Sequence, residues 1–263
     1  MISLEQIQSY FPPQIRNHPD PARQKYMLKE YVQLLILDFL SVSPFAKKLV
    51  FIGDTNLRLV KGIDRFSEDL DFDCKDFSAN EFAEMIGNVV TFLQRSGWRA
   101  ETREKPNSNL RAYRSCIYFP ELLFELSLSG YCEERFLVKS ESQNQGVYYQ
   151  SIIANIRGCG FYFPFPVPPD DILCSMKLSA LLSRQKGRDF YDVLFLLAQT
   201  PPNYDYLAKK QHIHNWQELK TALLQTTKQV NLQHKSKDFE HLLFNNNSEK
   251  ILLMNEFPES ICQ

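Results

Sequence analysis

The stretch from Gly53 to Asp73, "GDTNLRLVKGIDRFSEDLDFD", decides how we interpret this chain. Near its end, carboxylates alternate with apolar side chains. Successive side chains of a β-strand point to opposite faces, so Asp69 and Asp71 would share one face, about 7 Å apart. Leu70 and Phe72 would then enter the core on the other face. The stretch predicts a half-buried strand that carries a pair of carboxylates.

Such a pair suggests a metal site. Two carboxylates held this close repel each other, and a divalent cation between them makes the arrangement favourable. Oxygen ligands of this kind suit Mg²⁺ or Mn²⁺, which also bridge to substrate phosphates. Glu125 lies on the polar face of a second predicted strand, within 122–128. We therefore predict Asp69, Asp71 and Glu125 as metal ligands; the alternative is a D-x-D pattern that occurs by chance at a strand end.

A phosphate-binding turn would complete such a site. The segment "FIGDTNLRL", residues 51–59, predicts a buried strand, a tight turn at Gly53 and a helix start. The first N–H groups of a helix have no helical acceptor and bind anions. The Thr55 hydroxyl could add a donor, while Asp54 could instead cap a helix at 54–62. The order of strand, glycine turn, helix and D-x-D strand would bring the phosphates of a nucleotide to a metal.

The composition is that of an ordinary folded protein. The chain has 263 residues, of which 44% are hydrophobic and 23% charged, and its formal net charge is −1. No global basic field therefore indicates nucleic acid. The six cysteines never form a C-x-x-C pair, which argues against a disulfide framework or a zinc site. The first residues lack a signal-peptide pattern, and the apolar stretch at 31–40 is too short to span a bilayer. We expect a cytoplasmic protein that does not enter a membrane.

The pattern along the chain changes near residue 168. Before this point, helical segments at 20–48 and 78–98 alternate with strand-like segments at 48–52, 68–73, 111–119, 135–140 and 151–158. Ser78 and Glu81 form a predicted capping box for the second of these helices. After the proline-rich segment 163–171, the pattern is helical at 171–184, 188–199 and 215–230. We therefore predict two domains, 1–168 and 169–263.

With these motifs in this order, the sequence resembles the AbiEii/MenT-type toxins, which are nucleotidyltransferase-like proteins of the DNA polymerase β superfamily. The family's turn Gly-Gly-(Thr/Ser)-x-Leu-Arg and its motif Arg-Phe-Ser-(Glu/Thr)-Asp-x-Asp-Phe correspond to "GDTNLRL" (53–59) and "RFSEDLDF" (65–72). A later Lys-x-x-Ala-x-x-x-Arg and Asp-x-x-Asp correspond to "KLSALLSRQKGRDFYD" (177–192). The resemblance covers roughly residues 25–198. Asp54 departs from it, because the family usually has Gly or Ser there.

The resemblance implies an α+β fold, namely a polymerase β-like nucleotidyltransferase domain with a mixed sheet followed by a C-terminal helical bundle. It implies a metal-dependent enzyme that transfers a nucleotide from an NTP to an RNA acceptor, the 3′ end of tRNA. Such a protein would be the toxin of a type IV-like toxin–antitoxin or phage-defence system and would have a cognate antitoxin. The implied catalytic residues are Asp69, Asp71, Lys177 and Asp192. The implied nucleotide-binding residues are Gly53, Asp54, Thr55, Arg65, Ser67, Lys177 and Arg184.

Other interpretations stay open. Lys177 and Arg184 share one face of a predicted helix and could meet phosphates, or they could form exposed ion pairs of about 0–1 kcal/mol each. Basic residues near the D-x-D motif could meet an RNA backbone or simply be solvated: Arg58, Lys61, Arg65, Arg111, Arg114, Lys186 and Arg188. The chain could also be a catalytically weakened nucleotide-, RNA- or partner-binding protein of the same fold. A nucleotidyltransferase that modifies a small molecule would use the same D-x-D motif.

Overall fold

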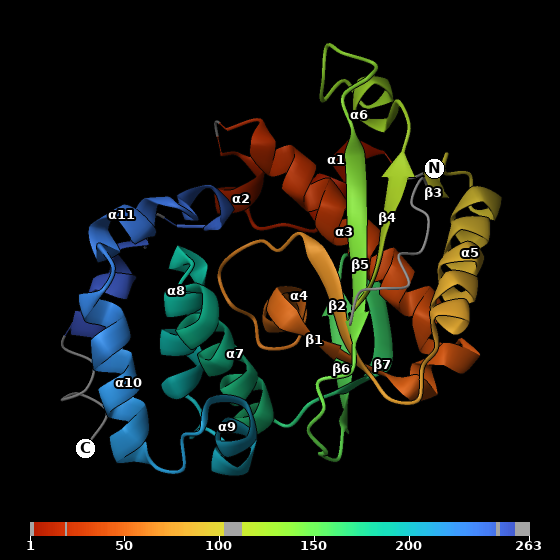
Figure 1. The fold of residues 1–263 in the computed structure, drawn as a ribbon. Coiled ribbons are helices and arrows are strands. Elements are labelled where there is room, and N and C mark those ends of the chain that lie inside the picture. The colour runs from red at the N-terminus through yellow and green to blue at the C-terminus, as the bar shows by residue number, and fades with distance from the viewer. Residues whose placement is uncertain (1–2, 19, 103–111, 246–247, 256–263) are drawn as a thin grey trace. The chain divides into compact units, whose positions relative to one another are not determined.

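The structure, a computed structural model, describes residues 3–18, 20–102, 112–245 and 248–255. The chain divides into two units. In Figure 1 most of the N-terminal unit is coloured from red to green, and most of the C-terminal unit from teal to blue. The N-terminal unit comprises Met1–Gly62, Phe66–Gly146 and Ser151–Val167, and the C-terminal unit comprises Ile63–Arg65, Val147–Gln150 and Pro168–Gln263. Within the described ranges, no helix is long and apolar enough to cross a membrane.

The N-terminal unit contains a mixed sheet. Its helical elements are α1 (Leu4–Ser9), α2 (Pro13–Arg16), α3 (Ala22–Ser41), η1 (Pro44–Lys48), α4 (Gly53–Leu59), α5 (Ala79–Arg95) and α6 (Leu122–Glu125). Its strands are β1 (Leu49–Ile52), β2 (Asp69–Cys74), β3 (Glu101–Thr102), β4 (Tyr113–Phe119), β5 (Phe136–Gln143), β6 (Ile152–Gly158) and β7 (Phe161–Val167). The sheet order is β1-β2-β5-β4-β3, with β2 and β5 parallel and the other pairs antiparallel. The predicted mixed sheet is confirmed.

Strand β2 shows the alternation that the D-x-D pattern predicts. Leu70 and Phe72 are only 0% and 1% exposed, whereas Asp69 and Asp71 are half-buried. The ring of Phe72 packs against Phe165 of β7, with the ring centroids 6.1 Å apart. One face of the sheet therefore belongs to the apolar core, and the two carboxylates lie on the other face.

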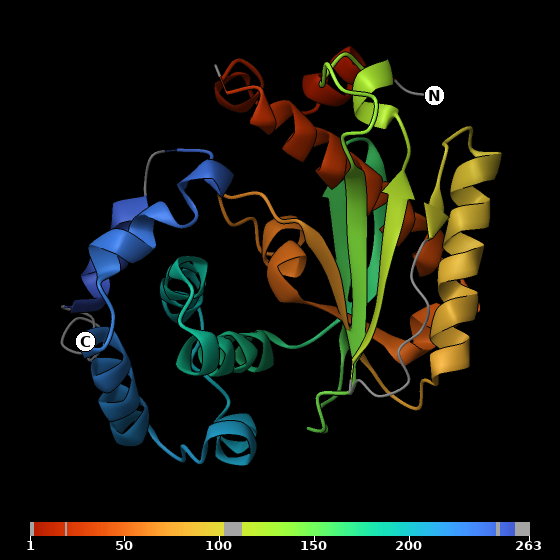
Figure 2. The same cartoon turned by 45° about the horizontal axis from the view of Figure 1, so that its top comes forward.

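Two long helices cover the apolar face (Figure 2). Helix α3 packs against β5 and helix α5 packs against β4. The helices also contact each other, since the rings of Phe39 and Phe92 stack with centroids 4.4 Å apart. Helix α5 begins with the predicted capping box, in which Ser78 and Glu81 exchange side-chain-to-backbone hydrogen bonds. This confirms the predicted start of α5.

The segment after β4 is a short helix, α6, and the predicted strand at 122–128 is wrong. Leu122 and Leu123 are adjacent and both buried, at 3% and 2% exposure, while Phe124 is 52% exposed. A strand cannot bury two successive side chains on one face, because neighbouring side chains point in opposite directions. The helical backbone is closed by the N–H of Leu126, which donates to the carbonyl of Leu122 at 3.1 Å.

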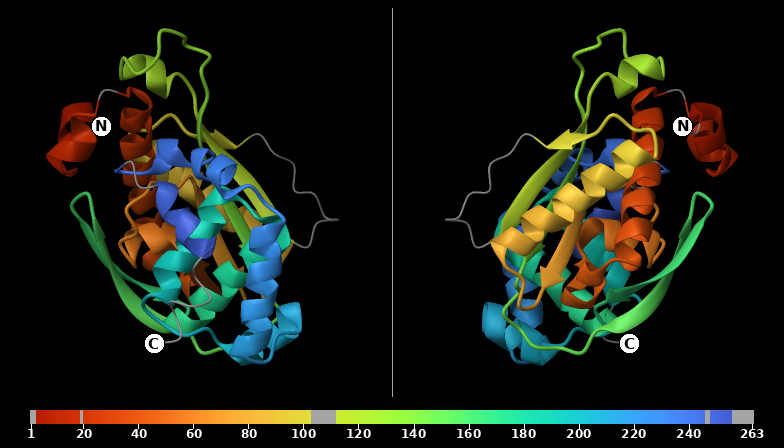
Figure 3. Two further views of the ribbon diagram at one scale, coloured as in Figure 1. Left: turned by 90° about the vertical axis from the view of Figure 1, so that its left-hand side faces the viewer. Right: turned by 90° about the vertical axis from the view of Figure 1, so that its right-hand side faces the viewer.

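Strands β6 and β7 form a separate two-stranded ribbon, seen as a long hairpin in Figure 3. One face of the ribbon joins the core, where Ile156 and Phe165 are both 0% exposed. The opposite face carries Ile153 and Tyr162, which are 66% and 61% exposed. The ribbon is thus covered on one side only within the N-terminal unit.

The C-terminal unit is helical, as predicted. Its elements are α7 (Asp170–Arg184), α8 (Gly187–Leu197), α9 (Tyr204–Gln211), α10 (Trp216–Lys228), α11 (Leu232–Lys237), η2 (Glu240–Leu242) and η3 (Ser248–Asn255). Asn215 caps α10, and its side chain accepts a hydrogen bond from the N–H of Glu218 at 3.0 Å. Helix α8 begins where α11 comes closest: a Cβ added at Gly187 would lie 2.0 Å from the carbonyl oxygen of Lys235. Only glycine fits at this position.

We expect Gly187→Ala to destabilise the C-terminal unit by about 1–3 kcal/mol, because the new methyl group collides with backbone that cannot easily move. Urea denaturation followed by circular dichroism measures this change. Gly87→Ala is the matched control, since no atom lies within 4 Å of its added Cβ on helix α5. Replacing a glycine in an open helix by alanine should stabilise the protein by about 0.5–1 kcal/mol. Equal midpoints for Gly187→Ala and the wild type would contradict the close packing of α8 against α11.

Candidate active site

The glycine turn and the D-x-D strand meet at one point. Ile52, the last residue of β1, is paired with Asp71 across the antiparallel ladder. Gly53 follows with φ of +82°, a conformation that side chains disfavour. A Cβ added at Gly53 would lie 2.3 Å from Oδ2 and 2.8 Å from Cβ of Asp71. The Asp71 carboxylate therefore occupies the space that a side chain at position 53 would need.

Two buried hydroxyl groups hold α4 against the start of β2. Thr55 and Ser67 are 0% and 4% exposed, and their Oγ atoms are 2.8 Å apart. The Thr55 hydroxyl also lies in hydrogen-bonding contact with the carbonyl oxygen of Asp69. Gln33 of α3 donates to the Ser67 carbonyl at 3.3 Å. We assign Thr55 and Ser67 a positioning role in place of the predicted direct contact with nucleotide, because their hydroxyls face the interior.

Asp54 does not cap helix α4, and the predicted N-cap role is wrong. The helix begins at Gly53, one residue earlier than expected, and its N-cap residue is Ile52 without a side-chain hydrogen bond. Asp54 lies in the first turn of α4 and is 8% exposed. A carboxylate in the first turn interacts favourably with the positive end of the helix dipole. This position explains how an acidic residue is accepted in the turn.

Glu125 does not lie on a strand of the sheet, so the reason for predicting it as a metal ligand is removed. It ends helix α6, and its carboxylate forms an ion pair with Arg99 at 3.2 Å. Across the described part of the chain, no three His, Cys, Asp or Glu side chains gather closely enough to hold a metal ion. Asp69 and Asp71 of β2 remain the predicted metal ligands.

The acidic residue that does reach Asp71 from a neighbouring strand is Glu141, which the sequence interpretation missed. Glu141 of β5 is the parallel partner of Asp71, and Arg114 of β4 is the partner of Glu141. Arg114 Nε and Nη2 lie 2.7 and 3.2 Å from the Glu141 carboxylate oxygens. Hydrogen bonding and charge from Glu141, with a further contribution from Asp71, raise the pKa of Arg114. The available signal was that larger polar residues alternate with small serines in "VKSESQ" (138–143), which places Lys139, Glu141 and Gln143 on one face of a strand.

A buried ion cluster lies in the C-terminal unit. Asp192 of α8 accepts two hydrogen bonds from Arg65, Nε to Oδ1 at 2.8 Å and Nη2 to Oδ2 at 2.7 Å. Lys177 of α7 lies 2.9 Å from the same Oδ2. The side chains of Arg65 and Asp192 are both 0% exposed, and that of Lys177 is 5% exposed. Arg65 therefore cannot meet a nucleotide or an RNA backbone directly, and this part of the prediction is wrong.

The remaining predicted cations have varied surroundings. Arg184 is paired with the fully buried Asp189 at 2.7 Å and keeps 41% of its side chain exposed. Arg58 is held by Glu30 through hydrogen bonds of 2.8 and 3.0 Å. Arg111 lies outside the described residues. Arg184 thus combines an accessible side chain with a fixed anchor, as does Arg114, whose side chain is 59% exposed beside Glu141.

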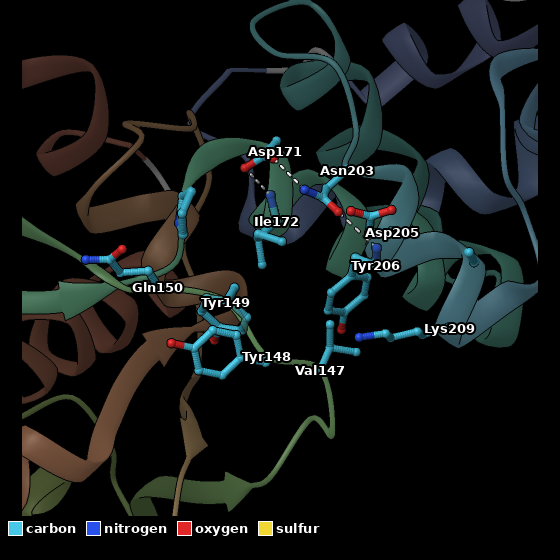
Figure 4. A pocket seen from close by; sticks show the side chains of 12 residues that line it. Val147, Tyr148, Tyr149, Gln150, Asp171, Ile172, Asn203, Asp205, Tyr206 and Lys209 are labelled. Atoms are coloured by element: carbon cyan, nitrogen blue, oxygen red, sulfur yellow. Dashed lines mark hydrogen bonds between the residues drawn. The ribbon is translucent and has the colours of Figure 1, made fainter.

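A cavity of about 510 Å³ lies within the C-terminal unit (Figure 4). Among its lining residues are Tyr148, Ile172, Tyr206 and Lys209. On its wall, the Asn203 side chain donates to Asp171 at 2.8 Å. None of the predicted site residues lines this cavity. The cavity is therefore separate from the candidate residues described above.

Comparison with known proteins supports a specific family. The model of the family described as "Nucleotidyl transferase AbiEii toxin, Type IV TA system" matches residues 35–251. No curated protein sequence matched the chain. The fold is similar to that of MenT4, a nucleotidyltransferase toxin from Mycobacterium tuberculosis H37Rv, with a TM-score of 0.65 and 16% identity over 99% of this chain and 89% of that chain. It is also similar to JHP933 from Helicobacter pylori, with a TM-score of 0.57 and 21% identity over 90% and 91% of the chains.

The two structural likenesses concern the fold, since both identities are low. The family match is independent of them and spans most of the chain, including the glycine turn, the D-x-D strand and the Lys177–Asp192 segment. The chain belongs to the AbiEii family of nucleotidyl transferase toxins of type IV toxin–antitoxin systems.

Proposed function

We propose that this protein is a metal-dependent enzyme that transfers a nucleotide from an NTP to an RNA acceptor, the 3′ end of tRNA. The observation that carries the proposal is the contact between the bare backbone of Gly53 and the carboxylate of Asp71. This contact puts an acidic ligand beside backbone N–H groups that can bind phosphate. Family membership supports nucleotidyl transfer and a toxin function.

The residues at the glycine turn fit a divalent cation. Asp69 and Asp71 supply oxygen ligands from one face of β2, the donor type that Mg²⁺ and Mn²⁺ prefer. When bound, such an ion neutralises phosphate charge and lowers the pKa of an attacking hydroxyl group. The protein's own contribution is to hold the backbone of Asp69 against α4 through the buried Thr55 hydroxyl, which also contacts the Ser67 hydroxyl. Glu125, at the end of helix α6 and paired with Arg99, is not among the proposed ligands.

For Lys177, Asp192 and Arg184 the proposal rests on the family motif. Lys177 would supply positive charge to the triphosphate, and Arg184 would bind the nucleotide. Asp192 is a positioning residue for Lys177, because it already holds this ammonium group at 2.9 Å and is itself fixed by Arg65. Phosphoryl and nucleotidyl transfer depend mainly on such positioning and charge stabilisation.

The wider context of the proposal follows from the family. A toxin of this kind would act in the cytoplasm, where NTPs and tRNA are found, and a cognate antitoxin would control it. A role in phage defence is included in this proposal. The acceptor distinguishes this proposal from a nucleotidyltransferase that modifies a small molecule. With a small-molecule acceptor, the label from the NTP would appear outside the RNA.

The first prediction concerns the carboxylate pair. Asp69→Asn and Asp71→Asn should each reduce transfer of labelled nucleotide to total tRNA by at least about 100-fold, because each removes a charged ligand from the reaction site. The assay supplies each labelled NTP in turn with Mg²⁺. Asp76→Asn, on the exposed turn after β2, is the control and should keep wild-type activity. Full activity in Asp71→Asn, or no transfer by the wild type with any NTP, would refute the proposal.

A second prediction tests the contact at the turn. Gly53→Ala should abolish transfer, because its methyl group needs the space of the Asp71 carboxylate. Gly62→Ala is the matched control: its φ is +74°, so the backbone strain is similar, but no atom lies within 4 Å of the added Cβ. Loss of transfer in both variants to the same extent would assign the effect to backbone strain rather than to the displaced carboxylate.

A third prediction separates charge from folding in the buried cluster. Lys177→Met should reduce transfer by at least about 100-fold and cost only about 1–2 kcal/mol of stability, since Asp192 keeps both hydrogen bonds from Arg65. Arg65→Met should cost about 3–5 kcal/mol, because a buried carboxylate loses its bidentate partner. Urea denaturation and the transfer assay are measured on the same samples. If Lys177→Met transfers nucleotide normally, the ammonium group has only a structural role.

A further inference from the structure

Lys139 lies beside the carboxylate pair, on the next strand of the sheet. In the parallel ladder of β2 and β5, Lys139 is the partner of Asp69. Paired residues of neighbouring strands present their side chains on the same face, and the two strands are about 5 Å apart. The Lys139 side chain is exposed, whereas Val138 before it and Ser140 after it are buried. The face that carries Asp69 therefore also carries an accessible ammonium group.

This ammonium group does not take part in holding the sheet together. Among the described residues, the Lys139 side chain forms no ion pair or hydrogen bond, although a carboxylate lies directly across the ladder. Arg114 on β4 differs, because it donates hydrogen bonds of 2.7 and 3.2 Å to Glu141. The charge of Glu141 is thereby offset, so it does not repel an anion that approaches Lys139. Lys139 keeps its N–H donors available for a ligand.

The order of the strands indicates which ligand Lys139 binds. Strand β2 lies between β1 and β5. The glycine turn follows β1, and the proposed function puts the phosphates of the NTP there, on the β1 side of the carboxylates. In nucleotidyl transfer, the attacking and leaving oxygens lie on opposite sides of the α-phosphorus. The acceptor must therefore reach this phosphorus from the β5 side, where Lys139 lies.

We infer that Lys139 binds the last internucleotide phosphate of the acceptor RNA and so positions its 3′ hydroxyl group at the carboxylate pair. This inference rests on the proposed function and adds the acceptor side of the site. In the reaction, the 3′ oxygen forms a bond to the α-phosphorus, the bond from this phosphorus to the bridging oxygen breaks, and pyrophosphate leaves with that electron pair. The hydroxyl proton passes to water. Lys139 exchanges no proton in this step, because its role is to hold the acceptor by charge.

The spacing of the strands supports the choice of this phosphate. The phosphate closest to a 3′ hydroxyl group is the one that joins the terminal nucleotide to the preceding one. A lysine one strand away from Asp69 can contact this phosphate while the hydroxyl group stays at the carboxylates, since the lysine side chain is long and flexible. An ammonium group binds phosphate as a point charge and reads no base. Lys139 therefore favours an RNA 3′ end over a small molecule that has no phosphate.

Binding of tRNA in the absence of NTP tests the contact directly. Lys139→Gln should weaken binding by about tenfold and reduce the slope of log K against log salt concentration by about 0.7, because one phosphate contact to a single strand is lost. Lys139→Arg keeps the charge and should retain wild-type binding. Lys47→Gln is the matched control: Lys47 is also exposed, but it lies before β1, at the end of this strand away from Gly53. Equal affinity and slope for Lys139→Gln and Lys47→Gln would overturn the inference.

A modified acceptor tests which phosphate Lys139 binds. When a neutral methylphosphonate replaces the last internucleotide phosphate of the tRNA, the affinity of the wild type should fall by about tenfold. The affinity of Lys139→Gln should not fall further, because the variant has already lost this contact. Additive losses in the variant and the modified tRNA would assign Lys139 to another ligand.

Kinetics separate this inference from the proposed function. In the transfer assay, Lys139→Gln should raise KM for tRNA by about tenfold and leave KM for the NTP unchanged. Circular dichroism verifies that the variant is folded. A raised KM for the NTP instead would put Lys139 on the nucleotide side and overturn the inference. A wild type that binds tRNA through Lys139 but transfers no nucleotide would refute the proposed function and leave the RNA contact standing.

Discussion

The contact between Gly53 and Asp71 is the constraint on which the candidate site depends. The turn after β1 can approach β2 this closely only because residue 53 has no side chain and accepts a φ of +82°. A hydrogen bond of 2.8 Å between the hydroxyls of Thr55 and Ser67 then holds the first turn of α4 against the residues that precede β2. Helix α4 therefore starts at Gly53, and the space beside this residue is left to the Asp71 carboxylate. A backbone feature and a chemical group are specified together, which is why the glycine and the acidic motif occur in one short stretch.

The buried cluster around Asp192 solves a different problem. Removing charges from water is costly, and a buried carboxylate is stable only when its partners replace the lost hydration. Asp192 meets this demand with a bidentate arginine and a lysine. Because Arg65 belongs to the C-terminal unit and Phe66 to the N-terminal unit, the motif "RFSEDLDF" is shared between them. The segment that carries Arg65 is further fixed by a β-bridge to Leu243. The arginine of the motif thus serves to attach this segment to the helical unit.

Local patterns in the sequence predicted much of this structure, and contacts between distant residues account for what they missed. The alternation in β2 and the capping box of α5 are local rules, and both hold. The strand predicted through Glu125 is wrong because the alternating apolar residues from Leu122 do not form one buried face: α6 buries the adjacent Leu122 and Leu123 and leaves Phe124 exposed. Arg65, the bidentate partner of Asp192, lies 127 residues away, and no spacing rule reveals this pairing. The pairing of Asp71 with Glu141 likewise depends on the order of the strands, which sequence alone did not provide.

The row formed by Asp71, Glu141 and Arg114 shows how the sheet limits the charge at the site. Two carboxylates on adjacent strands repel each other, and like charges opposite one another destabilise a sheet. Arg114 on the next strand donates a hydrogen bond of 2.7 Å from Nε to the Glu141 carboxylate. The negative charge of Glu141 beside Asp71 is therefore balanced within the sheet. Glu141 is consequently committed to the arginine rather than to a metal. Asp71 lies beside the glycine turn with Asp69 two residues before it on the same strand, and a cluster of carboxylates at this place favours the binding of a cation.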